Sequence, residues 1–255
     1  MRILCTNDDG IYAPGLEVLE EIARELTDDV WTVAPENEQS GASHSLSLAF
    51  PLRLRKLAER RFAVLGTPAD SVLMAVRKLM PEEPDLVLSG VNRGQNIADD
   101  VTYSGTIAAA MEGTALGLRS IALSQAYSIR RSELKWNTAR KHGPALVRKL
   151  KDMDLGPGVL INVNFPDCEP DEVKGIEVTR QGKRDQNLIH LDQRTDLRER
   201  DYYWIGFRRE RSNPADGTDL KALYEGRISV TPLHMNLTQI EAMEPLKTAL
   251  DGSSR

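Results

Sequence analysis

Residues 2–15 read RILCTNDDGIYAPG. Residues 2–6 are short and mostly apolar, and a polar Asn-Asp-Asp-Gly follows at residues 7–10, which predicts a buried strand that ends in a loop. Apolar residues then recur at helical spacing from residue 14 to residue 26, and Pro14 suits the first turn of a helix. This order of strand, polar loop and helix is typical of the start of an α/β domain.

The same alternation continues along the chain. Further buried strands are predicted at residues 30–34, 85–89, 121–123 and 158–163, and helices at residues 68–80, 106–116 and 133–150. Residues 52–57 and 61–65 are predicted to form a small antiparallel pair. Strands that alternate with helices predict a doubly wound, mainly parallel, Rossmann-like α/β sheet. Such a sheet binds ligands at the carboxyl ends of its strands, where the strand order reverses.

The C-terminal part of the chain has a different pattern. Residues 176–179, 202–207 and 228–232 are strand-like, and polar, charged stretches separate them. We interpret residues 1–173 as the α/β core, and residues 174–255 as C-terminal strands with a β-hairpin extension of the same domain. Residues 202–204 are all aromatic, which predicts either a contact with another subunit or packing on the same chain.

Composition limits the classes of function. The chain has 255 residues, a net charge of −5 and a pI near 5.5, which argues against binding to nucleic-acid duplexes, because these need a basic face. No apolar run approaches the ~20 residues of a membrane span, and no signal peptide is apparent. The two cysteines form neither a disulfide framework nor a metal motif. We therefore expect a cytoplasmic protein that does not enter a membrane.

Asp8 and Asp9 directly follow the first predicted strand. Their charges repel each other unless a cation lies nearby. The loops after the next two parallel strands, residues 37–43 and 89–96, would meet them at one edge of the sheet and add hydroxyl and amide oxygens. Oxygen donors suit Mg²⁺ or Mn²⁺ rather than zinc. The alternative is a plain Asp-Gly turn with solvated acids.

Ser104, Gly105 and Thr106 begin a helix of small residues. The free N–H groups and positive dipole end of such a start bind phosphate well. N-capping alone would also explain Ser104 or Thr106, and the two roles are compatible.

Several short motifs occur in a fixed order along the chain. They are TNDDG (6–10), APG (13–15), SGAS (40–43), GTP (66–68), SGVN (89–92), YSGT (103–106) and TPLH (231–234). Each motif is weak alone. Together, and in register over nearly the whole chain, they resemble the SurE family.

The resemblance implies a phosphatase that hydrolyses nucleoside 5′- and 3′-monophosphates with metal-activated water. One divalent ion, Mg²⁺ or Mn²⁺, would be held by Asp8, Asp9, Ser40 and Asn92, and the two aspartates would be catalytic. The resemblance also implies a homodimer or homotetramer assembled through the C-terminal extension. Residues 180–218 match the family least clearly.

The sequence also contains candidate residues for phosphate binding and for structural roles. The candidate phosphate-binding residues are Asn96, Ser104, Gly105 and Thr106. His44 and His234 are expected to make local structural hydrogen bonds, although His234 could instead donate a proton to a leaving group. Arg93 could neutralise phosphate or be a solvated loop cation. Trp31 and Trp136 are expected to pack against the core.

Two alternative functions can be compared with the sequence, because each requires its own pattern of residues. In an aspartyl-phosphate phosphatase, Asp8 or Asp9 would be the nucleophile, but such enzymes usually show an Asp-x-Asp spacing, which is absent here. A receiver-like signalling domain would need an acceptor Asp after a middle strand. The strand at residues 86–88 leads instead to Asn92.

Overall fold

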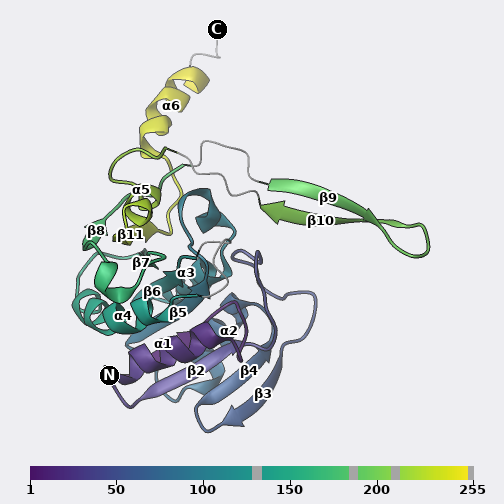
Figure 1. Cartoon of the computed structure of the whole chain (residues 1–255), viewed down its shortest axis with the longest axis vertical. Helices are drawn as coiled ribbons and strands as arrows, with labels where there is room; N and C mark the ends of the chain where they lie inside the picture. Colours follow the sequence, from purple (N-terminus) through teal and green to yellow (C-terminus); the bar gives the residue numbers. More distant parts are fainter. Residues whose placement is uncertain (128–133, 184–188, 208–212, 252–255) are drawn as a thin grey trace.

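The computed structural model describes residues 1–127, 134–183, 189–207 and 213–251 (Figure 1). The strands within these ranges are β1 Ile3–Thr6, β2 Val30–Pro35, β3 Arg53–Ala58, β4 Arg61–Leu65, β5 Leu86–Arg93, β6 Ser120–Gln125, β7 Val159–Phe165, β8 Ile176–Val178, β9 Ile189–Thr195, β10 Asp201–Phe207 and β11 Ile228–His234. The α-helices are α1 Pro14–Arg24, α2 Pro68–Met74, α3 Gly105–Ala115, α4 Trp136–Leu150, α5 Asp219–Tyr224 and α6 Met243–Asp251. None of the helices in the described ranges has both the length and the apolar character that crossing a bilayer requires.

The main sheet has nine strands in the order β3-β4-β2-β1-β5-β6-β7-β11-β8. The central run from β4 to β7 is parallel throughout, and β3 and β11 pair antiparallel with their inner neighbours. The predicted doubly wound, mainly parallel α/β fold is therefore confirmed. So is the predicted antiparallel pair, which forms β3 and β4.

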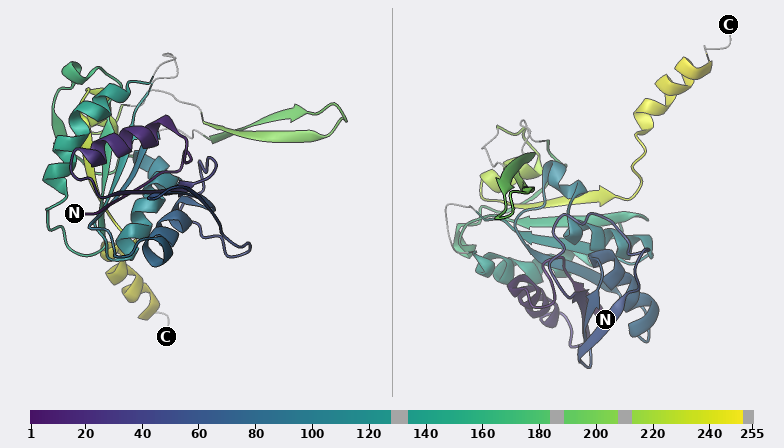
Figure 2. Two further views of the ribbon diagram at one scale, coloured as in Figure 1. Left: turned by 90° about the horizontal axis from the view of Figure 1, so that it is seen from below. Right: turned by 90° about the vertical axis from the view of Figure 1, so that its right-hand side faces the viewer.

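Helices cover both faces of this sheet (Figure 2). Helices α1 and α4 pack together on one face, and α2 and α3 pack together on the other. Strand β1 is buried on both faces: Ile3 and Cys5 belong to the core under α1, whereas Leu4 belongs to the core under α2. A strand enclosed in this way needs a continuous apolar run, which residues 3–5 provide.

The strand order reverses at β1. The chain goes from β1 to β2 on one side of it, and later returns to place β5 on the other side. The carboxyl ends of β1, β2 and β5 therefore lie side by side at the point where open α/β sheets bind ligands. These are the ends from which residues 7–10, 37–43 and 94–97 leave the sheet.

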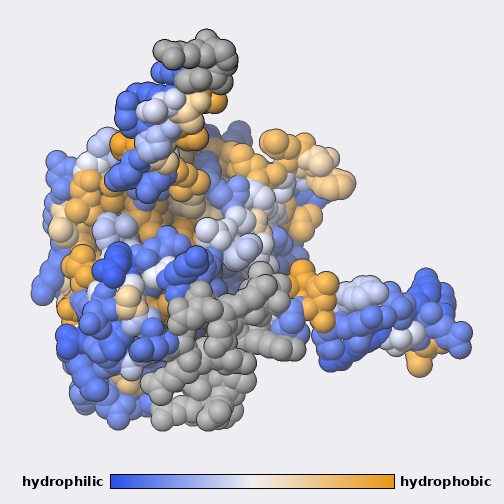
Figure 3. Space-filling view, turned by 90° about the horizontal axis from the view of Figure 1, so that it is seen from above, coloured by the Kyte–Doolittle hydropathy of each residue, from blue (hydrophilic) through white to orange (hydrophobic). Residues whose placement is uncertain are grey.

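The C-terminal part contributes to the sheet and also extends beyond it. Strands β11 and β8 complete one sheet edge, while β9 and β10 form a separate two-stranded hairpin that projects from the body (Figures 1 and 3). The sequence predicted β10 but not its partner β9. It also missed α5 and α6, and it began α4 at Glu133, which lies outside the described residues; α4 begins at Trp136.

Candidate active site

Asp8 and Asp9 turn in different directions after β1. The Asp8 carboxylate is buried and accepts a hydrogen bond from the Thr106 hydroxyl at the start of α3. The half-buried Asp9 carboxylate accepts a hydrogen bond of 3.0 Å from the backbone N–H of Arg93, at the end of β5. The chain bends at these two residues, and the pair therefore contacts the start of α3 through Asp8 and the end of β5 through Asp9.

Gly105 lets the start of α3 approach Asp8. A Cβ atom at Gly105 would lie 2.7 Å from the Asp8 Cβ and 2.9 Å from its Oδ2. Only glycine therefore fits at this helix position with Asp8 in place. The predicted helix start and the predicted carboxylate are in direct contact.

The surroundings disfavour negative charge on both aspartates. Burial, and secondarily the charge of Asp9, raise the pKa of Asp8 to about 7, although hydrogen bonds from Thr106 oppose the shift. Burial also raises the pKa of Asp9, and the charge of Glu38 adds to this effect. Burial therefore disfavours the ionised form of both carboxylates, and the nearby charge of Arg93 offsets this only in part for Asp9.

The other two predicted ligands lie beside residues that contact the pair. The backbone N–H of Gln39, which precedes Ser40, donates to the Asp8 carbonyl oxygen at 2.7 Å. Arg93, which bonds to Asp9, directly follows Asn92. The Ser40 hydroxyl donates to Glu38 at 2.8 Å, and the Asn92 amide nitrogen donates to the Gly94 carbonyl at 2.8 Å. The fold thus brings the three predicted segments together, although Asn92 lies within β5, which runs to Arg93, and not in the loop predicted after residue 88.

The donor set fits a hard divalent cation. Within the described ranges, no group of three or more His, Cys, Asp and Glu side chains is placed to hold a metal ion. The pair instead offers two carboxylates, with a hydroxyl and an amide on adjacent loops, and these donors are all oxygens. A cation there would offset the charge that burial and repulsion make costly.

Known proteins match this chain over most of its length. The family model described as "Survival protein SurE" matches residues 3–188. The chain belongs to the SurE family.

Curated relatives named "5′-nucleotidase SurE" are similar throughout. The protein from Methylobacterium nodulans is 63% identical over 240 residues, covering 93% of this chain and 95% of the relative. The one from Parvibaculum lavamentivorans is 62% identical over 252 residues, covering 98% and 91%. The crystal structure of the SurE protein from Aquifex aeolicus superposes with a TM-score of 0.84 at 38% identity, covering 98% of this chain and all of that one.

The residues predicted to bind phosphate in this SurE-family chain already have internal partners. The Ser104 hydroxyl accepts from the Ile107 N–H at 3.1 Å, so its predicted N-capping role is confirmed. The Thr106 hydroxyl is bound to Asp8. Binding of phosphate by these residues and by Gly105 stays a prediction, and it would use the helix start beside an aspartate.

Asn96 belongs to a buried amide network that the sequence analysis missed. Its backbone N–H donates to Asn164 at 2.8 Å, and its carbonyl oxygen accepts from Asn162 at 2.8 Å and from Asn164 at 3.1 Å. Its side-chain nitrogen donates to Ser124 at 3.0 Å. Asn162 and Asn164 stand at alternate positions of the apolar strand β7, a signal that could have shown them. The network fixes the backbone of Asn96 and leaves its role toward phosphate a prediction.

The loop that carries Ser40 is hydrogen-bonded to the segment before α3 and to α3 itself. The backbone N–H of Ser43 donates to the Tyr103 carbonyl at 3.2 Å, and the Ser43 hydroxyl donates to the Thr102 carbonyl at 2.8 Å. His44 pairs with Glu112 of α3 at 2.9 Å. The predicted structural role of His44 is confirmed.

His234 lies away from this site. It pairs with Val159 at the start of β7, whereas the site lies at the carboxyl ends of β1 and β5. Its ring nitrogen accepts a hydrogen bond of 2.9 Å from the backbone N–H of Asn236, which confirms the predicted structural bond.

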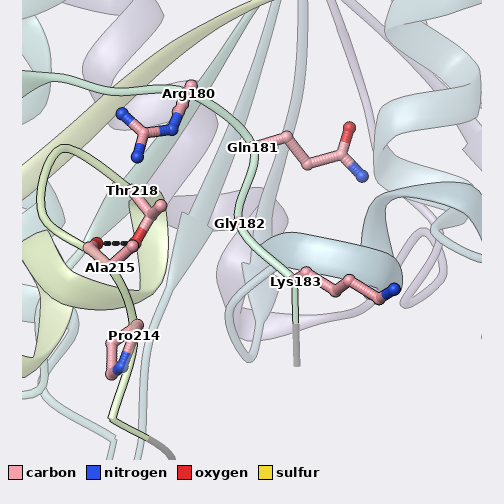
Figure 4. A pocket seen from close by; sticks show the side chains of 7 residues that line it. All are labelled: Arg180, Gln181, Gly182, Lys183, Pro214, Ala215 and Thr218. Atoms are coloured by element: carbon pink, nitrogen blue, oxygen red, sulfur yellow. Dashed lines mark hydrogen bonds between the residues drawn. The ribbon is translucent and has the colours of Figure 1, made fainter. Parts of the chain in front are cut away.

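The described residues line two cavities. One, of about 280 Å³, is bounded by Asp9 and lies between the start of α1 and the start of α4. The other, of about 310 Å³, lies at the base of the hairpin (Figure 4), where Arg180 and Gln181 point to opposite sides. Gln181 donates to the Ala98 carbonyl at 2.8 Å. None of the described residues that line the second cavity is shared with the cavity beside Asp9.

Proposed function

We propose that this chain is a divalent-metal-dependent phosphomonoesterase that hydrolyses nucleoside 5′- and 3′-monophosphates. The observation that carries the proposal is the pair of adjacent aspartates at the switch point of the sheet, where Asp8 contacts the start of α3 and Asp9 contacts the end of β5. The name 5′-nucleotidase, given to relatives about 60% identical, supports the substrate class.

Asp8, Asp9, Ser40 and Asn92 are proposed to hold one Mg²⁺ or Mn²⁺ ion. When bound, the ion neutralises phosphate charge and lowers the pKa of a coordinated water. The protein's own part is mainly positioning. Thr106 and Gly105 fix the Asp8 carboxylate, the Arg93 N–H fixes Asp9, and the remaining N–H groups at the start of α3 are proposed to bind phosphate oxygens.

The decisive experiment is a phosphate-release assay. The purified protein would be assayed with 5′-AMP, 3′-AMP and a polyphosphate, each with Mg²⁺, with Mn²⁺ and with chelator. We expect release from both nucleotides that needs added metal and ends in chelator. Full turnover by metal-stripped protein would contradict the proposal. Labelled phosphate retained on Asp8 or Asp9 during turnover would favour an aspartyl-phosphate mechanism instead.

We also propose that the hairpin joins subunits in a homodimer or homotetramer. Tyr203 and Trp204 are 56% and 60% exposed, and Ile205 is 67% exposed, on an arm that leaves the body of the chain (Figure 3). Exposed aromatic and aliphatic side chains of this kind are enriched in subunit contacts. The predicted segment, residues 184–217, includes residues 184–188 and 208–212, which lie outside the described ranges. Replacing residues 189–207 with a short Gly-Ser linker should lower the mass measured by light scattering; an unchanged mass would count against this role.

A further inference from the structure

The cavity beside Asp9 is built from four separate segments. The start of α1 contributes Ala13 and Pro14, the loop after β2 contributes Glu38, the end of β5 contributes Arg93, and the start of α4 contributes Trp136. Apart from Asp9, none of these residues belongs to the predicted ligand set. The sequence assigned Trp136 to core packing, and it does pack against the core under α1. Trp136 also forms a wall of this cavity, a role that core packing does not explain.

The cavity lies on the opposite side of the aspartate pair from α3. Asp8 turns toward α3, which covers one face of the sheet, whereas Asp9 bounds the cavity between α1 and α4, which cover the other face. A phosphate bound at the start of α3 and a group in this cavity would therefore lie on either side of the two carboxylates. This is the arrangement that a phosphate ester requires, because its phosphoryl and alcohol parts must flank the reacting bond.

The walls of the cavity differ in chemistry. Trp136 and Pro14 contribute apolar rings to the lining, while Glu38, Asp9 and Arg93 contribute charged residues. A nucleoside has the same division: a flat aromatic base at one end and a ribose with hydroxyl groups at the other. Carboxylates such as that of Glu38 accept hydrogen bonds from hydroxyl groups.

The volume of about 280 Å³ is close to the lower end of the ~300–1,000 Å³ typical of small-molecule sites. This size is suited to one nucleoside.

The Trp136 ring packs closely against the start of α1. A Cβ atom at Gly15 would lie 3.0 Å from Cη2 of Trp136 and 2.0 Å from the carbonyl oxygen of Val91. The start of α1 thus runs closely between β5 and the indole ring, and only glycine permits this approach. A rigid aromatic wall loses little conformational freedom on binding, which favours stacking against a flat ligand.

We propose that this cavity binds the nucleoside part of the substrate and that the base stacks on Trp136. The inference rests on the proposed function for the position of the phosphate, and it goes further by naming the residue that selects nucleotides among phosphate esters. Trp136 is a specificity residue in this account and takes no part in the chemical step.

The first test compares a substrate that has a base with one that lacks it. Rates would be measured on 5′-AMP and on ribose 5-phosphate for the full-length wild type, Trp136→Ala, Trp136→Phe and the control Trp31→Ala. Trp31 stacks on Phe62 with ring centroids 6.3 Å apart, near the amino end of β2 and far from the cavity, so its truncation removes the same atoms elsewhere.

We expect Trp136→Ala to lower kcat/KM for 5′-AMP about 5- to 150-fold, mostly through KM, because base–aromatic stacking contributes ~1–3 kcal/mol. Its rate on ribose 5-phosphate should change less than twofold. Trp136→Phe should retain most of the activity on 5′-AMP, and Trp31→Ala should leave the ratio of the two substrates unchanged. Equal losses on both substrates in Trp136→Ala, or no loss on 5′-AMP, would overturn the inference.

The second test uses adenosine, which has no phosphate and cannot react. Calorimetry should detect adenosine binding to the wild type and weaker binding, by the same factor, to Trp136→Ala. This readout separates the two proposals. If the wild type hydrolyses no nucleotide with any metal, the proposed function fails, while adenosine binding still decides the role of the cavity. Equal adenosine affinity in the wild type and Trp136→Ala, or no binding to either, overturns the inference alone.

Discussion

The two sides of the aspartate pair are built differently. On the Asp8 side, α3 closes over the carboxylate, Gly105 touches it, Thr106 donates to it, and burial raises its pKa to about 7. On the Asp9 side the carboxylate is only half buried and borders a cavity with an indole wall. The closed side has the fixed, dry geometry that electrostatic catalysis needs, and the open side has room for a ligand. The two adjacent aspartates therefore face two different environments.

The largest expected partial loss of turnover is at Asn92, which directly precedes Arg93 at the end of β5. Asn92→Ala should lower turnover about 100-fold or more, because losing a metal ligand or transition-state contact has effects of that order. Steady-state rates at saturating Mg²⁺ would measure it. Asn236→Ala is the control, since Asn236 likewise supports a turn, accepting from the Thr238 N–H at 3.0 Å, but far from the site. A near-normal rate would show that Asn92 serves only its own turn through Gly94.

A smaller effect is expected on the closed side. Thr106→Val keeps the shape of the side chain but removes the hydroxyl that holds Asp8. Groups that orient a metal ligand typically contribute 10- to 100-fold, so we expect a loss of that size in kcat and in metal affinity. The rate and the metal dependence would both be measured.

Thr114→Val provides the control, because Thr114 is a second buried threonine of α3, and its hydroxyl donates only to the Ala110 carbonyl at 2.8 Å. Equal losses in both variants would mean that α3 is merely destabilised.

The sequence predicted the Asp8 side of the pair better than the Asp9 side. The closed side follows from local patterns: an apolar strand, an Asp-Asp-Gly turn and a Ser-Gly-Thr helix start. The open side does not, because the cavity joins residues 9, 13–15, 38, 93 and 136, which only the sheet order brings together. The sequence predicts core packing for Trp136, which the structure shows, but a single sequence does not show that the same side chain also lines a cavity.

The hairpin was hard to predict for another physical reason. Strand β9 carries the charged residues Asp192 and Arg194, which form an ion pair at 3.1 Å on its surface. Among the described residues, it joins none of the buried core clusters. Its apolar residues at alternate positions are Ile189 and Leu191 alone, which is too short a run to give a clear period-two pattern, the main signal of a strand. Strand β10 was predicted because its residues are aromatic and β-branched. The domain boundary at residue 173 stays a prediction, although β8 and β11 pair within the main sheet.

The smallest expected effect, on stability, tests whether charge is costly on the closed side. Burial and the charge of Asp9 raise the pKa of Asp8 to about 7, above its unfolded value. Between these two pKa values the folded protein holds a proton that the unfolded chain releases, so the contribution of Asp8 to metal-free stability should be greatest below about pH 4 and be lost as pH rises through about 7. Asp9→Asn removes the charge that contributes to the shift. The variant should lose activity, show a shallower fall, and gain roughly 0.5–2 kcal/mol at neutral pH in chelator. In excess Mg²⁺ the order should reverse, because the ion binds only the folded wild type.

Thermal unfolding of both proteins from pH 4 to pH 8, with chelator and with Mg²⁺, measures the stability difference and its pH dependence. A variant that is less stable even in chelator would mean that the bond from the Arg93 N–H to Asp9, at 3.0 Å, outweighs the repulsion. Asp9 would then be a structural acceptor, and the pair would lose its main support as a metal site.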